Sequence, residues 1–286
     1  MKSRLLFFFL SAWISLTQAA DLPDWQNAPP EPAERVGGVL DTASNQWLSP
    51  TELVKRLTPS QQILLGEKHD NPDHHRLQLW LLEQLQSQIP RAALVMEMLT
   101  QAQQPMVDAL QASAEQLTGQ PLADSLDWSE GWDWPMYQPI VEWALRNGVP
   151  LRAANLEWEE IRELYRNPAP LSPRYSDQVR REMEQIIEES HCGKLPDDQL
   201  ASMLTIQQER DIRMAKSLAK APVPAVLIAG NYHVRKDLGL PLHLDGITPV
   251  VVMLHEVGTP LPGAAQADYV WLTPAIPEQD YCAQFQ

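Results

Sequence analysis

The chain has 286 residues, and 44% of them are hydrophobic, which is enough to bury a sizeable core in one large domain or two small ones. Its 22 Lys and Arg residues stand against 37 Asp and Glu residues, so the formal net charge is −15 at pH 7. Nucleic acids and anionic lipids bind basic patches, so this charge argues against either as a partner.

Residues 1–20 have the pattern of a secretory signal peptide. Lys2 and Arg4 precede an almost wholly apolar run, and small residues follow it at 17–20. An uncleaved membrane anchor is the alternative, but the apolar run of about 12 residues is shorter than the ~20 that span a bilayer. We therefore expect cleavage, export to the periplasm and a mature chain without a transmembrane segment. No cysteine lies near the cleavage site, so we expect no lipid attachment there.

Beyond a proline-rich lead at 21–37, the chain is expected to form a single α/β domain over 38–286. Five short apolar runs are typical of buried parallel strands: 63–65, 92–96, 150–154, 225–229 and 250–254. Amphipathic stretches at 72–88, 135–147 and 197–219 lie between them. This alternation predicts a mostly parallel sheet flanked by helices.

A segment rich in Glu and Arg, at about 156–196, interrupts the alternation of strands and helices. Its pattern is mostly helical. We expect a helical insertion that could form a lid or a small subdomain.

The chain has two cysteines, Cys192 and Cys282. In an exported protein they would meet an oxidising compartment, which favours a disulfide between them. Two free thiols are the alternative.

The most informative stretch, 66–75, directly follows the first predicted strand and contains three histidines. Asn71 and Pro72 fit the N-cap and first position of the next helix. Glu67 and His69 should then lie on a strand-to-helix loop at the carboxyl end of the sheet, where open α/β folds bind ligands. A solvated polar loop is the alternative.

Two further strand ends carry polar side chains. Glu97 follows the apolar run 93–96, and His233 follows 225–229 after Gly230 and Asn231. A surface glutamate and a structural histidine are the alternative interpretations. We expect Glu67, His69, Glu97 and His233 to face one crevice, within reach of one ion or one water.

Two carboxylates and two imidazoles could hold a divalent metal such as manganese, cobalt, iron or zinc. Without a metal, the same groups could serve as general base and general acid. The sequence has no serine elbow, P-loop, Rossmann fingerprint or CxxC motif, which removes the commonest hydrolase, nucleotide-binding and thiol-redox interpretations.

Seven short motifs, in this order, together resemble one known family: 64–71, Glu97, 131–135, Asn155, 191–193, 208–211 and 230–233. This is the ChaN family of exported, often lipid-anchored proteins associated with haem uptake. Its wider superfamily includes Tiki-type proteases and erythromycin esterases, with a GExH-like first motif and a late Gly-x-x-His. The resemblance runs from about residue 38 to the C-terminus. Many relatives carry a lipobox cysteine and this chain does not, so membrane anchoring is not carried over.

The resemblance implies that a homodimer binds haem, with a tyrosine as the iron ligand and His or Lys groups on the propionates. A tyrosinate oxygen is a suitable hard ligand for ferric iron. The sequence has no CxxCH motif, so covalent c-type haem is excluded. The sequence leaves four tyrosines open as iron ligands, Tyr137, Tyr165, Tyr175 and Tyr232, and offers three cations for the propionates, Lys68, His74 and Arg76.

The function expected from these features is that of a periplasmic haem-binding protein that assists haem or iron uptake. The alternative is a metal-dependent or acid/His hydrolase of the same superfamily, acting on a peptide or ester bond. A carrier does not require Glu67, His69, Glu97 and His233 together, whereas a metallohydrolase does. The sequence leaves open whether this cluster is catalytic.

Overall fold

The structure is a computed structural model that describes residues 21–30, 35–113, 117–280 and 282–283. The predicted signal peptide lies outside the described residues. Within the described part, no helix is both long enough and apolar enough to cross a membrane.

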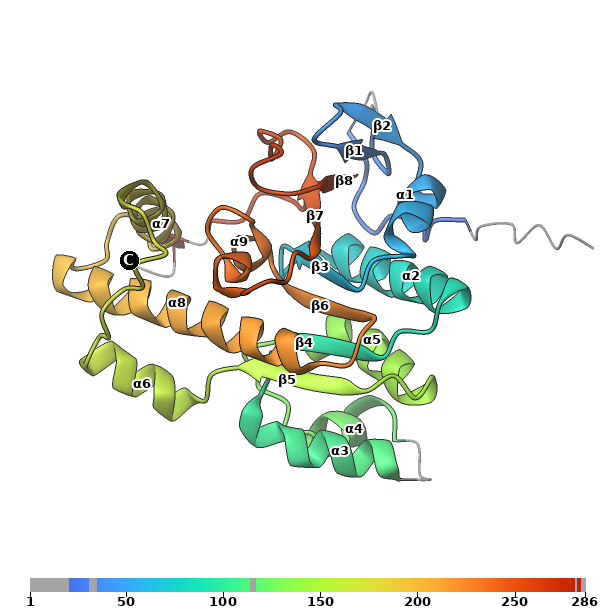
Figure 1. The fold of residues 1–286 in the computed structure, drawn as a ribbon, viewed down its shortest axis with the longest axis horizontal. Coiled ribbons are helices and arrows are strands. Elements are labelled where there is room, and N and C mark those ends of the chain that lie inside the picture. Colours follow the sequence, from blue (N-terminus) through green and yellow to red (C-terminus); the bar gives the residue numbers. More distant parts are fainter. Residues whose placement is uncertain (1–20, 31–34, 114–116, 281, 284–286) are drawn as a thin grey trace, which may run out of the picture.

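The fold is built on an eight-stranded sheet with the order β2-β1-β8-β7-β3-β6-β4-β5 (Figure 1). The five predicted strands form one parallel block, from β7 to β5 in this order. The α/β prediction is therefore confirmed. The strands are β1 (Val39–Asp41), β2 (Gln46–Leu48), β3 (Gln62–Glu67), β4 (Ala93–Thr100), β5 (Leu151–Asn155), β6 (Ala225–Gly230), β7 (Val250–Glu256) and β8 (Tyr269–Thr273).

Three strands were not predicted from the sequence. β8 pairs parallel to β7, while β1 pairs antiparallel to both β8 and β2. β1 and β2 are three residues long, which is too short for a period-2 pattern to be recognised.

Helices cover both faces of the sheet (Figure 1). α8 crosses one face, and α2 and α5 lie on the other. The predicted helices at 72–88, 135–147 and 197–219 correspond to α2, α5 and α8. The helices are α1 (Pro50–Leu57), α2 (Pro72–Gln88), α3 (Gln104–Ala112), α4 (Gly119–Ser125), α5 (Trp134–Arg146), α6 (Trp158–Arg166), α7 (Asp177–Ser190), α8 (Asp197–Lys220) and α9 (Asn231–Val234), with 3-10 turns η1 (Gln101–Gln103) and η2 (Leu240–His243).

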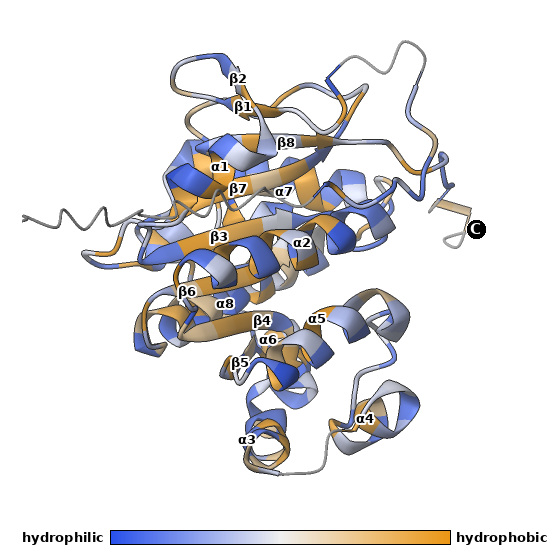
Figure 2. Cartoon of the chain, turned by 90° about the vertical axis from the view of Figure 1, so that its right-hand side faces the viewer, coloured by the Kyte–Doolittle hydropathy of each residue, from blue (hydrophilic) through white to orange (hydrophobic). Residues whose placement is uncertain are grey.

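The central strands are apolar on both faces, as a parallel sheet between helices requires (Figure 2). In β3, Ile63 and Leu65 pack in the core on the α2 side, and Leu64 packs in the core on the α8 side. Because neither face of these strands meets water, polar side chains are favoured near the carboxyl ends of the strands. Glu67 ends β3, and Glu97 follows Met96, the last β4 residue that pairs with β6.

The insertion forms a small helical layer beyond the sheet. α6 and α7 each contact α8 and lie on either side of it (Figure 1). Their packing is supported by a separate apolar cluster that includes Tyr175, Met183, Ile187, Leu204 and Leu238. This layer therefore has its own small core.

The predicted disulfide is present. Cys192 and Cys282 are bonded, with their Cα atoms 5.8 Å apart, inside the range that a disulfide can bridge. The bond ties the C-terminal tail to the turn that follows α7.

Replacing both cysteines by alanine should lower the free energy of unfolding by about 2–4 kcal/mol, because the bridge closes a loop with a sequence separation of 90. Urea denaturation monitored by tryptophan fluorescence measures this. Wild-type protein in a reducing agent is the control and should match the double variant. Superimposable curves for the oxidised protein and the variant would contradict a stabilising role.

Candidate functional site

The first part of the site is the loop between β3 and α2. Asn71 caps α2 as predicted, because its side chain accepts a hydrogen bond from the Asp73 N–H at 2.9 Å, and Pro72 takes the first helical position. The loop returns His69 toward the end of β3. There its Nδ1 lies 2.9 Å from Glu67 Oε1.

Glu67 is a buried carboxylate with partners on both oxygens. The Tyr137 hydroxyl donates to Oε1 at 2.6 Å, and the Gln78 amide donates to Oε2 at 2.7 Å. His75 Nδ1 lies 3.2 Å from Oε2. Burial by itself would raise the pKa of Glu67, but the charge of His75 and the hydrogen bond to His69 outweigh it and lower the pKa to about 2. Glu67 is therefore ionised at neutral pH.

Glu97 lies on β4, where the pairing with β5 shifts register between Met96 and Thr100. Such irregularities re-aim a side chain near a site. The Gly230 N–H donates to Glu97 Oε2 at 2.8 Å, and His233 Nε2 lies 3.4 Å from Oε1. Burial opposes ionisation here too, but the charges of His233 and His69 lower the pKa of Glu97.

His233, on α9, lies between two buried carboxylates. Its Nδ1 is 2.7 Å from Asp211 Oδ1, on α8, and its Nε2 faces Glu97. Burial would lower the pKa of His233, but the charges of Glu97 and Asp211 raise it. Burial raises the pKa of Asp211 to about 6. The sequence motif at 208–211 contained Asp211, but nothing in its local pattern distinguished it from a surface carboxylate.

These groups form a row in which carboxylates alternate with imidazoles: Glu67, His69, Glu97, His233 and Asp211. Hydrogen bonds or ion pairs join its neighbours except His69 and Glu97, which interact through their charges. The close approach in the middle of the row requires a glycine, because a Cβ on Gly230 would lie 2.7 Å from His69 Nε2 and 3.8 Å from Glu97 Oε2. The structure thus brings all four predicted residues to one cleft of about 910 Å³, and buried Asp211 extends the row behind His233 without lining the cleft.

The expected divalent-metal site is not supported. Among the described residues, no group of three or more His, Cys, Asp or Glu side chains is arranged to hold a metal ion. The physical reason is that each imidazole uses Nδ1 on an outer carboxylate, while hydrogen bonds from the protein occupy both oxygens of Glu67. The row is suited to holding and moving protons.

The three cations predicted for propionates are placed differently. Lys68 lines the cleft, where its Nζ lies 3.1 Å from Glu256. His74 is fully buried, and burial lowers its pKa to about 3, so the ring is neutral. Both ring nitrogens are occupied, since Nδ1 accepts from the Lys68 N–H and Nε2 contacts Thr273 Oγ1 at 3.0 Å. Arg76 lies on α2 and lines neither the cleft nor the cavity described next.

The four candidate tyrosines also separate into two kinds. Tyr137 and Tyr175 are buried, and burial raises the pKa of both hydroxyls. Tyr137 also donates to Glu67, whose negative charge holds the proton on the phenol. Tyr232 and Tyr165 are 53% and 38% exposed and line a second cavity.

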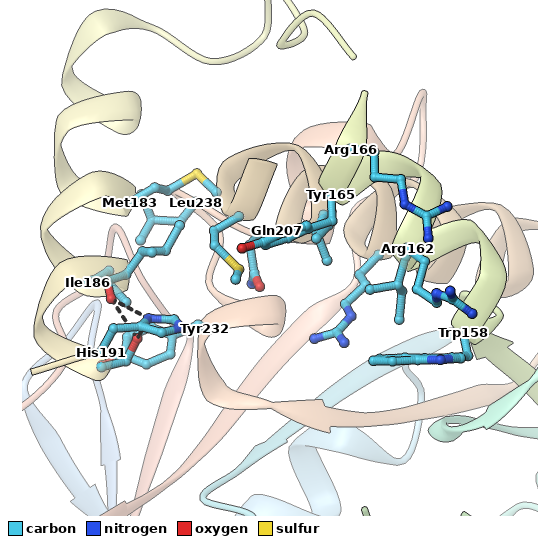
Figure 3. Close-up of a pocket in the computed structure, with 16 residues that line it drawn as sticks. Trp158, Arg162, Tyr165, Arg166, Met183, Ile186, His191, Gln207, Tyr232 and Leu238 are labelled. Carbon is cyan, nitrogen blue, oxygen red and sulfur yellow. Dashed lines mark hydrogen bonds between the residues drawn. The ribbon is translucent and has the colours of Figure 1, made fainter. Parts of the chain in front are cut away.

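This second cavity, of about 670 Å³, lies among α6, α7, α8 and α9 (Figure 3). We call it the helical cavity. It shares Ser190, Gln207, Arg210 and Tyr232 with the cleft. The remaining lining is apolar or basic: Trp158, Ile161, Arg162, Tyr165, Arg166, Met183, Ile186, Ile187, His191, Met203, Ile206 and Leu238.

Sequence reasoning did not single out Trp158, Arg162 and Arg166 on α6. A signal was present, because these residues are four apart and so lie on one face of a helix. The segment's general richness in charge concealed this pattern.

The pKa of His69, raised to about 9, should fall toward its ordinary value of 6.5 in Glu67→Gln. Burial by itself would lower this pKa, but the hydrogen bond to Glu67 and the nearby carboxylates raise it. In the wild type, the stability from protonated His69 is fully present below pH 6.5 and is lost as the pH rises through 9. NMR titration of the His69 ring measures this. Glu278→Gln, at an exposed position, is the control, and an unchanged His69 pKa in Glu67→Gln would contradict the pairing.

Gly230→Ala should lower the free energy of unfolding by about 1–3 kcal/mol, because the added methyl group overpacks His69. Gly263→Ala is the matched control, since nothing lies within 4 Å of a Cβ built there. Chemical denaturation of both variants measures the difference. Equal stability of the two variants would show that the row tolerates a side chain at its centre.

The chain was compared with known proteins. A family model described as "Haem-binding uptake, Tiki superfamily, ChaN" matches residues 53–244. Among solved structures, "Cofacial heme binding to ChaN of Campylobacter jejuni" is 28% identical, with a TM-score of 0.75, and the match covers 82% of this chain and 95% of that one.

Two other solved structures are much less similar. The type III effector HopBA1 is 12% identical, with a TM-score of 0.45 and coverage of 78% and 91%. The erythromycin esterase EreC is 14% identical, with a TM-score of 0.44 and coverage of 82% of each chain. No curated protein matches. The family model matches more than half of the chain, and the expected resemblance is confirmed: the chain belongs to the ChaN family of the Tiki superfamily.

Proposed function

We propose that this chain is a periplasmic haem-binding protein that assists haem uptake, and that haem occupies the helical cavity. The supporting observation is the lining of that cavity, which carries Arg162, Arg166 and Arg210 but no carboxylate among the described residues. The whole chain has 37 Asp and Glu residues and a net charge of −15, so the cavity lining has the opposite charge balance to the rest of the protein. Such a lining suits an apolar ligand that bears negative charge.

Haem has these properties, because it is a flat apolar ring with two propionates. The cavity volume of about 670 Å³ lies within the ~300–1,000 Å³ that small-molecule sites occupy. Apolar side chains that include Met183, Ile186 and Leu238 would contact the ring. Arg162 and Arg166, at the opposite side of the cavity from Tyr232 in Figure 3, would hold propionates.

Tyr232 is the candidate iron ligand among the four tyrosines. Its side chain is exposed and belongs to the wall that the helical cavity shares with the cleft. Tyr137 is held by Glu67, and Tyr175 is buried beside His243. Bound haem would supply ferric iron, for which a phenolate oxygen is a suitable ligand. Tyr165 is the second choice.

The proposal includes a homodimer. Trp158, Tyr165 and Tyr232 line the helical cavity and are 67%, 38% and 53% exposed, which is unusual for large hydrophobic residues. A second copy of the chain that covers them would bury this apolar surface. Cofacial haem binding is described for ChaN of Campylobacter jejuni, and a pair of copies joined at this surface could enclose haems that face one another.

Hemin should bind the purified protein with micromolar or better affinity and shift the Soret band. Tyr232→Phe should change that spectrum and weaken binding by at most about tenfold, because it removes the ligand oxygen but leaves the contacts to the ring and the propionates. Tyr175→Phe is the matched control and should leave the spectrum unchanged. If wild-type protein shows no Soret shift at a few micromolar hemin, the haem-binding proposal is wrong.

A second candidate function is an acid/His hydrolase that works without a metal ion. The observation in its favour is that the His69 side chain is 42% exposed in the cleft and is oriented by buried Glu67. The pKa values of about 9 for His69 and about 2 for Glu67 give a proton donor beside a carboxylate at neutral pH.

The same variants separate the two functions. His69→Ala and His233→Ala should leave hemin binding nearly unchanged if the protein is a carrier. If it is a hydrolase, both variants should abolish cleavage of a chromogenic ester, and Tyr232→Phe should leave cleavage intact. An ester-cleaving activity that survives both histidine variants would rule out the row as its catalytic site.

A further inference from the structure

We infer that the helical cavity recognises the carboxylates and the apolar face of a porphyrin rather than its metal, so that the protein also binds metal-free dicarboxylic porphyrins. This inference rests on the proposed function, because it concerns the same cavity. It widens the ligand class from haem to carboxylate-bearing porphyrins in general.

The first support is the state of the arginines that line the cavity. Arg166 has no ion-pair partner in the part of the chain that the structure describes, and the buried Nε of Arg210 has no hydrogen-bond partner there. Arg162 pairs only with Glu159, at 3.2 Å, and both side chains are well exposed. An exposed ion pair of this kind is weak and readily exchanged. Arg162 and Arg166 are therefore available to a ligand's carboxylates, while Arg210 adds positive charge at the wall shared with the cleft, where it also interacts with Glu97 and Asp211.

The second support is the apolar part of the cavity wall. Besides Tyr232, nine aliphatic or aromatic side chains line the space: Trp158, Ile161, Tyr165, Met183, Ile186, Ile187, Met203, Ile206 and Leu238. The gain from burying apolar surface scales with the buried area, which a metal-free porphyrin and haem share. The arginines and the apolar walls thus contact features of the ring that do not depend on iron.

The third support is the position of the proposed iron ligand. Tyr232 is 53% exposed and lies on the wall between the helical cavity and the cleft. His191 and Gln207 also line the helical cavity, but both already contact protein groups. The Tyr232 oxygen would give the iron one contact at a solvent-exposed wall, in addition to the contacts that the apolar side chains make with the ring and the arginines make with the carboxylates. Removing the metal should therefore cost little affinity.

The test uses the full mature protein with its disulfide intact, titrated separately with hemin and with protoporphyrin IX. Hemin is followed by its Soret band, and protoporphyrin IX by its own red fluorescence. We expect the two dissociation constants to agree within about tenfold. Tyr232→Phe should change the hemin spectrum and leave the affinity for protoporphyrin IX within about twofold.

The arginines are tested by Arg162→Gln/Arg166→Gln, which should weaken both ligands by about tenfold. Arg180→Gln/Arg181→Gln is the matched control. It makes the same change of charge at exposed positions on α7 that do not line the cavity, and it should leave both affinities within about twofold. Urea denaturation of each double variant checks that the fold is retained.

Each outcome bears on one claim. If hemin binds and protoporphyrin IX binds more than about tenfold more weakly, the inference is wrong and the proposed function stands. If neither binds, the proposed function itself fails. If both bind but the arginine variant behaves like its control, recognition through these carboxylate contacts is refuted.

Discussion

The buried carboxylate of Glu67 is the constraint on which the carboxyl edge of the sheet depends. An ionised carboxylate without water is costly unless charges and donors surround it. Here the compensation comes from three places in the chain: His69 on the following loop, Gln78 and His75 on α2, and Tyr137 on α5. The requirement of one anion therefore fixes how the loop, α2 and α5 meet at the end of β3.

The end of β6 and the short helix α9 that follows it connect the Glu67 end of the row to Glu97, His233 and the helical cavity. β6 ends at Gly230, which pairs with Glu67 and donates its N–H to Glu97. The side chains of the next residues point in different directions: His233 belongs to the buried row, while Tyr232 lines both the cleft and the helical cavity. On α8, Asp211 meets His233 and its neighbour Arg210 lines the shared wall. Adjacent residues on two helices thus serve two different environments.

The two spaces differ in chemistry. The cleft is lined by ionised side chains of both signs, held together by buried hydrogen bonds. The helical cavity is apolar and basic, and it is built largely from the insertion, which has its own small core. This division explains why the chain can keep an acid/base row beside a cavity suited to a large apolar anion. In this arrangement, the acid/base row does not have to contact a ligand in the helical cavity.

The amino-acid sequence was sufficient to predict the parallel sheet, its flanking helices, the polar strand ends and the cysteine pair. Strand and helix periodicity are local properties, and the carboxyl ends of parallel strands must meet at one edge. The short strands β1 and β2 were not predicted, because three residues are too few to show the alternation of a strand. Tertiary packing, in contrast, decided which tyrosines are exposed and which are buried, that His74 is neutral, and where the arginines gather. Tyr137 and Tyr232 are the same residue type in sequence, but one is buried against Glu67 and the other is exposed beside a cavity. Exposure and protonation depend on residues distant in the chain, so no local pattern can contain them.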